Sequence, residues 1–350
     1  MRIYIQMFLI AMLIAIVLRK RKALAVFGAA IPFFVIAALR YDVGTDYMYR
    51  YVPDYLRLYY GGRVGNLELG FKLLVKFCIF FFRKNFQVLF IITSFVIIAG
   101  IFYSIYRNSK NYIFSIALFF VAGYYFQSLN IVRQFMAMAI LLAGYRLIID
   151  KKYVKWVVVC LVASMIHTTA IIGVGLIVLN EMKEISIYKI VGFSFLAVVG
   201  NRFFRIILVK ILSFTRFAVY VNSLYDVSKI SITLILQNII IYMYMYYSFK
   251  IRTDKKYYEE DKFLLNIQAA TLLLVVLGSI ISLFDRMVLY FQIFQLISIP
   301  NFISASKKKE NAVVITFLIF TVYGFLFWRN FLVENQNEIL PYITFFNRYN

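Results

Sequence analysis

The sequence predicts an all-α fold: a polytopic integral membrane protein with about 10–12 transmembrane helices. Of its 350 residues, 63% are hydrophobic and only 15% are charged, whereas soluble domains average about 45–50% and about 25%. Apolar segments follow one another along the whole chain, and a spanning helix needs roughly 20 mostly apolar residues. Proline occurs only 4 times, and no Gly/Ser-rich linker marks off a soluble part. We therefore expect a single polytopic membrane domain over residues 1–350.

The apolar segments begin close to the first residue and continue nearly to the last. They are 3–18, 23–39, 69–82, 86–106, 112–126, 135–149, 156–180, 187–212, 231–249, 263–283, 287–304 and 312–328. The basic cluster Arg19–Lys22 follows the first segment instead of preceding it, which argues against a signal peptide. Because Lys and Arg concentrate in cytoplasmic loops, this cluster predicts a cytoplasmic first loop and an N-terminus outside.

Four further basic loops refine the predicted topology. These loops are 107–110, 150–155, 250–262 and 306–310. All four are expected in the cytoplasm, but the first two would lie outside if every apolar segment crossed. We therefore expect one segment within 69–106 to lie flat or re-enter, and a matching irregularity within 156–212. The 40–68 loop, the 127–134 and 284–286 turns and the C-terminus then face outside.

The charge balance excludes several classes of function. There are 38 Lys and Arg against 16 Asp and Glu, a net charge of +22, which would suggest nucleic acid in a soluble protein. Here the basic residues lie between apolar runs, so no nucleic-acid partner is expected. With 2 cysteines and 1 histidine, neither a disulfide framework nor a zinc site is available. No P-loop, Gly-x-Gly-x-x-Gly or Asp-x-Asp occurs, so we expect no cofactor and no metal.

Polar residues beside the apolar segments are candidates for function, because they are costly in a bilayer. The segment ending at Leu39 leads directly into a loop with Arg40, Asp46, Tyr47 and Glu68. Gly44 permits a tight turn that could direct Asp46 back toward Arg40. An aromatic belt at the membrane interface is the alternative reading of this tyrosine-rich loop.

A second cluster opens the helix expected after the 127–134 turn. Arg133 and Gln134 lie at its start, just after Asn130. Free backbone N–H groups and the helix dipole favour an anion there. The planar fork of an arginine suits phosphate better than lysine does. The alternative is an ordinary helix start.

Three further places carry polar or unusual residues. His167, the only histidine, lies 11 residues after Trp156, roughly 16 Å along a helix and therefore inside the hydrophobic layer. A core histidine bonded to a carbonyl is its alternative reading. Asp285 and Arg286 are adjacent, with Tyr290 one turn further on, and could simply pair in a solvated turn. The apolar tail 340–346 is expected to pack against the bundle.

The order of these signatures resembles the EpsG-like family of Wzy-type bacterial exopolysaccharide polymerases. The resemblance rests on Arg40-x-x-x-Gly44-Thr45-Asp46-Tyr47-x-x-Arg50-Tyr51, Leu67-Glu68-Leu69-Gly70-Phe71, Asn130-x-x-Arg133-Gln134, Ile166-His167-Thr168-Thr169-Ala170, Arg286-x-x-x-Tyr290-Phe291 and Leu340-Pro341-Tyr342. It implies a GT-C-like, multi-pass glycosyltransferase of the bacterial inner membrane. Such an enzyme joins undecaprenyl-diphosphate-linked repeat units at the outer face into an exopolysaccharide, capsule or O-antigen. The lipid-linked glycan, the lipid bilayer, a flippase and a chain-length regulator are the partners that the resemblance implies.

This reaction suggests roles for the polar residues. Arginines can stabilise the charge that develops on a diphosphate leaving group without a metal; the arginines expected on the outer side are Arg40, Arg133 and Arg286. The acceptor hydroxyl needs a base, which could be His167, Asp46 or Glu68, and the residues do not rank these. The remaining residues expected to bind substrate are Asn130, Gln134, Tyr47 and Tyr290.

Three other functions remain open at this point. A flippase or transporter of the lipid-linked glycan would use similar cationic cavities, although such proteins more often show two related halves. A membrane O-acyltransferase could rest on a buried histidine, but no Asp stands at a fixed helical spacing from His167. A membrane scaffold without catalysis is the third.

Overall fold

The computed structural model describes residues 1–65, 67–214, 232–252, 257–278, 280, 283–306 and 309–347. The basic loops expected at 250–262 and 306–310 lie partly outside the described residues. Helices dominate the described part of the chain, and a single pair of two-residue strands accompanies them there. The predicted all-α membrane fold is confirmed. Contacts divide the chain into two compact units, Met1–Val174 with Thr316–Asn350 and Gly175–Ile315.

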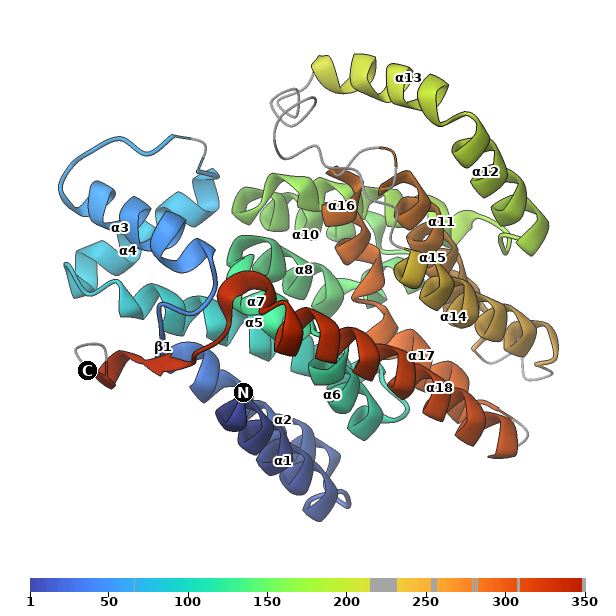
Figure 1. The fold of residues 1–350 in the computed structure, drawn as a ribbon, viewed down its shortest axis with the longest axis horizontal. Helices are drawn as coiled ribbons and strands as arrows, with labels where there is room; N and C mark the ends of the chain where they lie inside the picture. Colours follow the sequence, from blue (N-terminus) through green and yellow to red (C-terminus); the bar gives the residue numbers. More distant parts are fainter. Residues whose placement is uncertain are drawn as a thin grey trace. The chain divides into compact units, whose positions relative to one another are not determined.

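The first unit contains most of the chain's polar signatures. Its elements are α1 (Arg2–Val17), α2 (Lys22–Leu39), β1 (Arg40–Tyr41), η1 (Tyr47–Tyr51), α3 (Val52–Tyr59), α4 (Leu69–Phe82), α5 (Gln87–Asn108), α6 (Tyr112–Val121), α7 (Tyr124–Asn130), α8 (Val132–Gly144), α9 (Arg146–Ile149), α10 (Tyr153–Ile166), η2 (Thr168–Gly175), η4 (Trp328–Val333), η5 (Gln336–Glu338), β2 (Ile343–Thr344) and η6 (Phe345–Asn347). α1 and α2 lie side by side as a hairpin, and α3 lies beside α4 (Figure 1). α2 packs on α5, α5 on α8, and α8 on α10.

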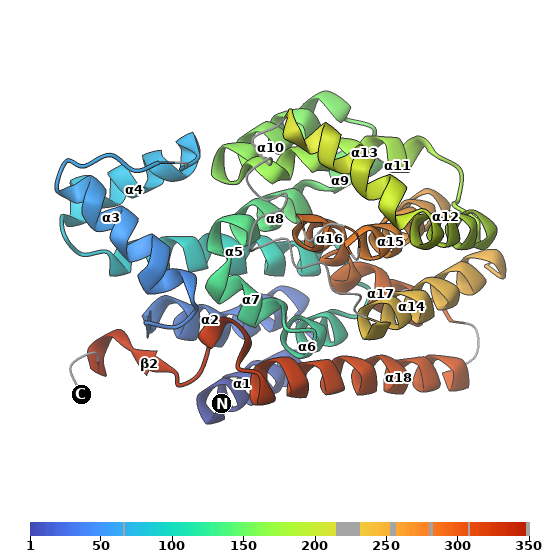
Figure 2. The same cartoon turned by 45° about the horizontal axis from the view of Figure 1, so that its top comes forward.

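The second unit is a helical bundle around α15. Its elements are α11 (Leu176–Glu181), α12 (Ile187–Val199), α13 (Asn201–Ser213), α14 (Ile232–Lys250), α15 (Tyr258–Gly278), α16 (Leu283–Gln292) and α17 (Gln295–Ser304). The side chains of Asn238, Gln268 and Gln295 bond to one another at 3.0 Å, joining α14, α15 and α17. Such buried hydrogen bonds between side-chain amides hold helices together in lipid, where no hydrophobic effect drives helices to associate. α18 (Lys309–Phe327) is a long, continuous helix in Figure 2.

The helices are long and apolar enough for a membrane protein with several spans. Among the described residues, 6 helices meet the length and composition of a span, or up to 9 if each bent pair counts as one. Apolar helices of 10–17 residues also occur, at Arg2–Val17, Tyr153–Ile166 and Thr168–Glu181. The expected number of spans, their orientation and the GT-C-like architecture stay predictions.

The irregularities expected from the basic loops have structural counterparts. α4 has only 14 residues, about 21 Å at the rise of an α-helix, and is too short for a hydrocarbon core of about 30 Å. Within 156–212, α10 ends at Ile166 and a 3₁₀ segment follows. Further on, Ile187–Ala197 and Arg202–Ile211 meet at 88°. One short helix and two breaks thus lie in these two regions, and whether a segment there lies flat or re-enters stays a prediction.

Two predicted turns differ from the structure, and one predicted loop contains short helices. Residues 127–130 belong to α7 instead of a turn, and the break within 127–134 is confined to Ile131, between α7 and α8. A further break that was not predicted lies at Gly123 with φ +77°, where a Cβ would lie 2.4 Å from the Phe331 ring. Asp285 and Arg286 lie in the first turn of α16. The 40–68 loop contains η1 and α3. The tail packs as expected, since Tyr342 donates a 2.9 Å hydrogen bond to the Ile36 carbonyl.

Candidate functional site

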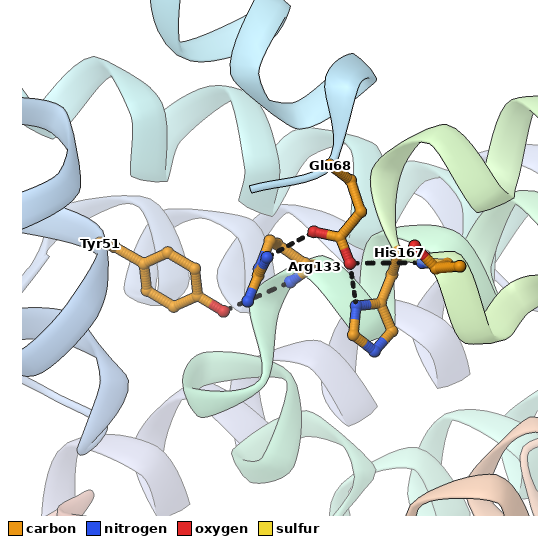
Figure 3. Close-up of polar contacts among 5 residues, drawn as sticks. Tyr51, Glu68, Arg133 and His167 are labelled. Carbon is orange, nitrogen blue, oxygen red and sulfur yellow. Dashed lines mark hydrogen bonds and ion pairs between the residues drawn. The ribbon is translucent and has the colours of Figure 1, made fainter. Parts of the chain in front are cut away.

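Three side chains from distant parts of the first unit meet at one carboxylate. Glu68 is the N-cap of α4, Arg133 is the second residue of α8, and His167 follows the last residue of α10. Glu68 Oε2 lies 2.5 Å from Arg133 Nη1, and Glu68 Oε1 lies 3.2 Å from His167 Nδ1. The backbone N–H of Thr168 donates to the same Oε1 at 3.3 Å. Figure 3 shows the carboxylate between the guanidinium and the imidazole.

A close approach of two helices brings Glu68 to His167. α4 packs on α10, and a Cβ added to Gly70 would lie 2.9 Å from both the Cβ and the carbonyl oxygen of Met165. α10 then ends because His167 leaves the helical region, with φ −148° and ψ 113°. The sequence had placed His167 inside a continuous helix. The observed helix end instead presents both the imidazole and the Thr168 N–H to the carboxylate.

Contacts at the start of α8 fix the position of Arg133. The helix begins at Val132, after Ile131 breaks from α7 with φ −86° and ψ 58°. The Arg133 backbone N–H donates to the Tyr51 hydroxyl at 3.5 Å, as seen in Figure 3. Its guanidinium lies 5.8 Å from the centre of the Phe71 ring, within cation–π range. The prediction that Arg133 opens a helix is confirmed.

The electrostatic environment keeps Glu68 ionised. Burial raises the pKa of this carboxyl, but the hydrogen bond with His167 and the charge of Arg133 outweigh burial and lower it from 4.5 to about 2. The side chains of Glu68, Arg133 and His167 are only 9%, 11% and 18% exposed, so their charges interact in a region of low dielectric. A carboxylate with so low a pKa is a weak proton acceptor, and its strength lies in orienting its partners.

Most of the chain matches the profile of a known protein family. A profile of the EpsG family matches residues 22–344. The chain belongs to the EpsG family. The resemblance drawn from the sequence motifs is confirmed. Membership of the EpsG family assigns the chain to the general class of polysaccharide polymerases. No curated protein and no solved structure matches it. With its apolar helices, the EpsG-family chain is a multi-pass membrane protein.

Asp46 and Asn130 lie next to the Glu68 cluster of the EpsG-family chain. The Asp46 backbone N–H donates to the Asn130 side-chain oxygen at 2.8 Å. The Asp46 carboxylate interacts electrostatically with Arg133 and Tyr51. The tight turn at Gly44 is present, with φ +97°, and Asp46 faces the charge of Arg133 across it. The roles of Asp46 and Asn130 stay predictions.

Arg40 and Tyr47 lie in a separate buried network. Arg40 is 1% exposed. Its guanidinium donates to the carbonyls of Ala37 and Leu129 and to the Ser94 hydroxyl. Tyr47 is fully buried and stacks on Phe90 at 3.9 Å between ring centres. These contacts hold the 40–47 loop on the bundle, and the substrate-binding roles of both residues stay predictions.

The remaining candidates are divided between the two units. Gln134 is buried in α8 of the first unit, with 3% exposure. Arg286 is exposed on α16 of the second unit, and Tyr290, on the same helix, is 4% exposed. Arg40 and Arg133 belong to the first unit and Arg286 to the second, and the expected clamp of these three arginines stays a prediction. Among the residues that the structure describes, no group of three or more His, Cys, Asp or Glu could hold a metal ion.

Sequence reasoning gave no role to several groups that the structure places at the site. Tyr51 was part of the motif that carries the family resemblance, but no role was predicted for it. Tyr51 is buried and Tyr49 is 79% exposed. Asp54 interacts electrostatically with Arg133 from α3. The Thr168 N–H is a backbone group that only the end of α10 exposes, and no sequence signal marks it.

The low pKa of Glu68 predicts how stability changes with pH. Because the folded-state pKa of about 2 lies below the ordinary 4.5, ionised Glu68 stabilises the fold above pH 4.5. At neutral pH this lowering corresponds to roughly 3 kcal/mol of unfolding free energy. Thermal unfolding of purified wild type and Glu68→Gln in detergent measures the difference. We expect wild type to be more stable than Glu68→Gln at pH 7, and this difference in stability to shrink as the pH falls from about 4.5 toward 2. A difference in stability that does not change with pH would contradict a lowered pKa for Glu68.

Proposed function

We propose that this EpsG-family protein is a membrane glycosyltransferase that polymerises oligosaccharide repeat units linked to undecaprenyl diphosphate. The reaction would take place at the outer face of the bacterial inner membrane and would require no nucleotide sugar. Family membership supports the polymerase class. The Arg133–Glu68–His167 cluster is the observation that carries the specific proposal, because it joins a positioned imidazole to a buried arginine.

In this proposal His167 is the base. His167 Nδ1 lies 3.2 Å from Glu68 Oε1, so we place the imidazole proton on Nδ1 and the lone pair on Nε2. Nε2 accepts the proton of the acceptor hydroxyl as that oxygen bonds to the anomeric carbon of the donor glycan. The bond between the anomeric carbon and the phosphate oxygen breaks, and undecaprenyl diphosphate leaves. Glu68 keeps the imidazole in this tautomer and stabilises the imidazolium that forms, as orienting carboxylates do in hydrolases.

Arg133 would stabilise the leaving diphosphate. It is in the first turn of α8, a helix of 13 residues, where backbone N–H groups and the helix dipole favour an anion. Its link to Glu68 fixes the guanidinium before substrate arrives, and preorganised charge is the most effective form of electrostatic catalysis. Asp46 remains a second candidate base, since it also interacts with Arg133.

An elongation assay with purified protein tests this function. Lipid-linked repeat units extracted from a producing strain are incubated with the full chain in detergent micelles, without an ion gradient or a nucleotide sugar. We expect glycans of several repeats on a gel, together with released undecaprenyl diphosphate. A flippase would leave single repeats unchanged in micelles, and an acyltransferase would incorporate label only from an acyl donor. Either of these results overturns the proposal.

A further inference from the structure

The segment 335–344, named here the C-terminal strap, crosses the loop that carries Asp46. Strand β2 pairs antiparallel with β1, joining Thr344 to Arg40 and Ile343 to Tyr41. Further back along the strap, the Glu338 carbonyl accepts a 3.2 Å hydrogen bond from the Gly44 N–H. The strap and the 40–47 loop therefore act as one structural element, although residues 48–334 separate them in sequence.

Asn337 makes the contact that reaches the candidate site. Its carbonyl accepts a 3.0 Å hydrogen bond from the Thr45 N–H. Its side-chain oxygen accepts a 2.9 Å hydrogen bond from the Asn130 amide nitrogen. The Asn130 oxygen in turn accepts from the Asp46 N–H at 2.8 Å. Asn337 thereby fixes which end of the Asn130 amide points to Asp46.

The strap holds an unfavourable backbone conformation to make these bonds. Asn335, Asn337 and Glu338 have φ of 44°, 67° and 52°, in the left-handed region that non-glycine residues rarely occupy. Such conformations cost free energy and persist only where the surroundings determine them. Three of them within four residues indicate that the placement of the strap matters to the fold around it.

Asn130 connects the strap to the catalytic cluster. It is the last residue of α7, and α8 begins two residues later with Val132 and Arg133. Asp46, on its other side, interacts electrostatically with Arg133. We propose that Asn337 is a positioning residue that, through the Asn130 amide, holds Asp46 against Arg133. This inference rests on the proposed function for its effect on polymerisation.

Two substitutions separate the side-chain bond from the backbone conformation. Asn337→Gly keeps the left-handed backbone and removes the bond to Asn130, because glycine adopts positive φ without strain. Asn337→Asp keeps an acceptor oxygen at the same place and also tolerates this region. Glu338→Gly is the matched control, since Glu338 has a similar φ and an exposed side chain.

The experiment compares these three variants and His167→Ala with wild type in a strain lacking the chromosomal copy. Hydrogen exchange of the purified chains measures the Thr45–Tyr47 amides, and gels of extracted glycan measure chain length. In Asn337→Gly we expect exchange about tenfold faster at these amides and long glycan reduced about tenfold, the equivalent of one hydrogen bond. Asn337→Asp and Glu338→Gly should stay close to wild type in both measurements.

Each outcome of this experiment tests a different part of the proposal. Unchanged exchange in Asn337→Gly, or faster exchange in Asn337→Asp, overturns the positioning role without reference to activity. Long glycan that persists in Asn337→Gly but is lost in His167→Ala overturns the link to catalysis and leaves the proposed function standing. Long glycan that persists in His167→Ala overturns the role of His167 as the base. Single repeats left unchanged by the purified chain in the elongation assay overturn the proposed function and with it the effect of Asn337 on polymerisation.

Discussion

Replacing His167 with alanine is expected to reduce polymerisation by about 10²- to 10⁴-fold, the usual contribution of a general base. The imidazole is the one group in the Glu68 cluster whose ordinary pKa, about 6.5, suits proton transfer near neutral pH. Glu68, with a pKa of about 2, is too weak a base to replace it. The measurement is the length distribution of glycan in a strain that carries only the variant, with single lipid-linked repeats quantified beside it. Repeats should accumulate as long chains disappear.

A variant on the same helix controls for damage to α10. The Ser164 hydroxyl donates only to the Leu161 carbonyl of its own helix, at 2.7 Å, so Ser164→Ala should leave chain length unchanged. Both variants must reach the wild-type amount in the membrane. Wild-type chain lengths in His167→Ala would leave Asp46 as the candidate base.

Arg133 is the position where stability and catalysis can be separated. Arg133→Met should lower polymerisation by about 10²- to 10³-fold, as loss of a preorganised electrostatic group does elsewhere. It should also destabilise the fold by about 3–5 kcal/mol, because the buried Glu68 carboxylate loses its guanidinium partner. Adding Glu68→Gln removes the negative charge that Arg133 had balanced. The double variant is therefore expected to recover much of the stability and none of the activity.

Thermal unfolding in detergent and the glycan gel together test this prediction. Glu184→Gln, in the partly exposed pair with Lys250 of the second unit, is the matched control and should cost at most about 1 kcal/mol. Polymerisation that returns with stability in the double variant would show that Arg133 has only a structural role.

Hydropathy and charge determined much of the fold without tertiary information. Long apolar runs determine helices in lipid, because every backbone polar group must be satisfied within the segment. The basic loops required an irregularity in 69–106 and another in 156–212. The short α4 and the breaks after Ile166 and Val199 lie in those regions.

Local helix breaks were harder to place, because their causes are contacts between distant residues. Gly123 breaks the chain between α6 and α7 where the Phe331 ring leaves no room for a Cβ. The sequence predicted a break only at 127–134, where polar residues gather and where Ile131 separates α7 from α8. A glycine alone carries no sign of the ring that will pack against it.

The candidate site was likewise only partly predictable from the sequence. Arg133, His167 and Glu68 were each marked by the cost of a polar group beside apolar segments. Their association was not predictable, since Glu68 and Arg133 are 65 residues apart. Glu68 meets His167 because Gly70 lets α4 approach Met165 on α10. Arg40 carried an equally strong signal, yet its guanidinium lies among backbone carbonyls and the Ser94 hydroxyl.

The sequence by itself determined the membrane class, the family and the short set of polar residues from which a site could be built. Those properties follow from composition and local spacing, which every part of the chain carries with it. Only the tertiary structure decided that Glu68 joins Arg133 to His167, and that Asn337 joins Asn130 to the Asp46 loop. Such pairings depend on helix ends and close approaches between segments distant in sequence, and no local pattern records them.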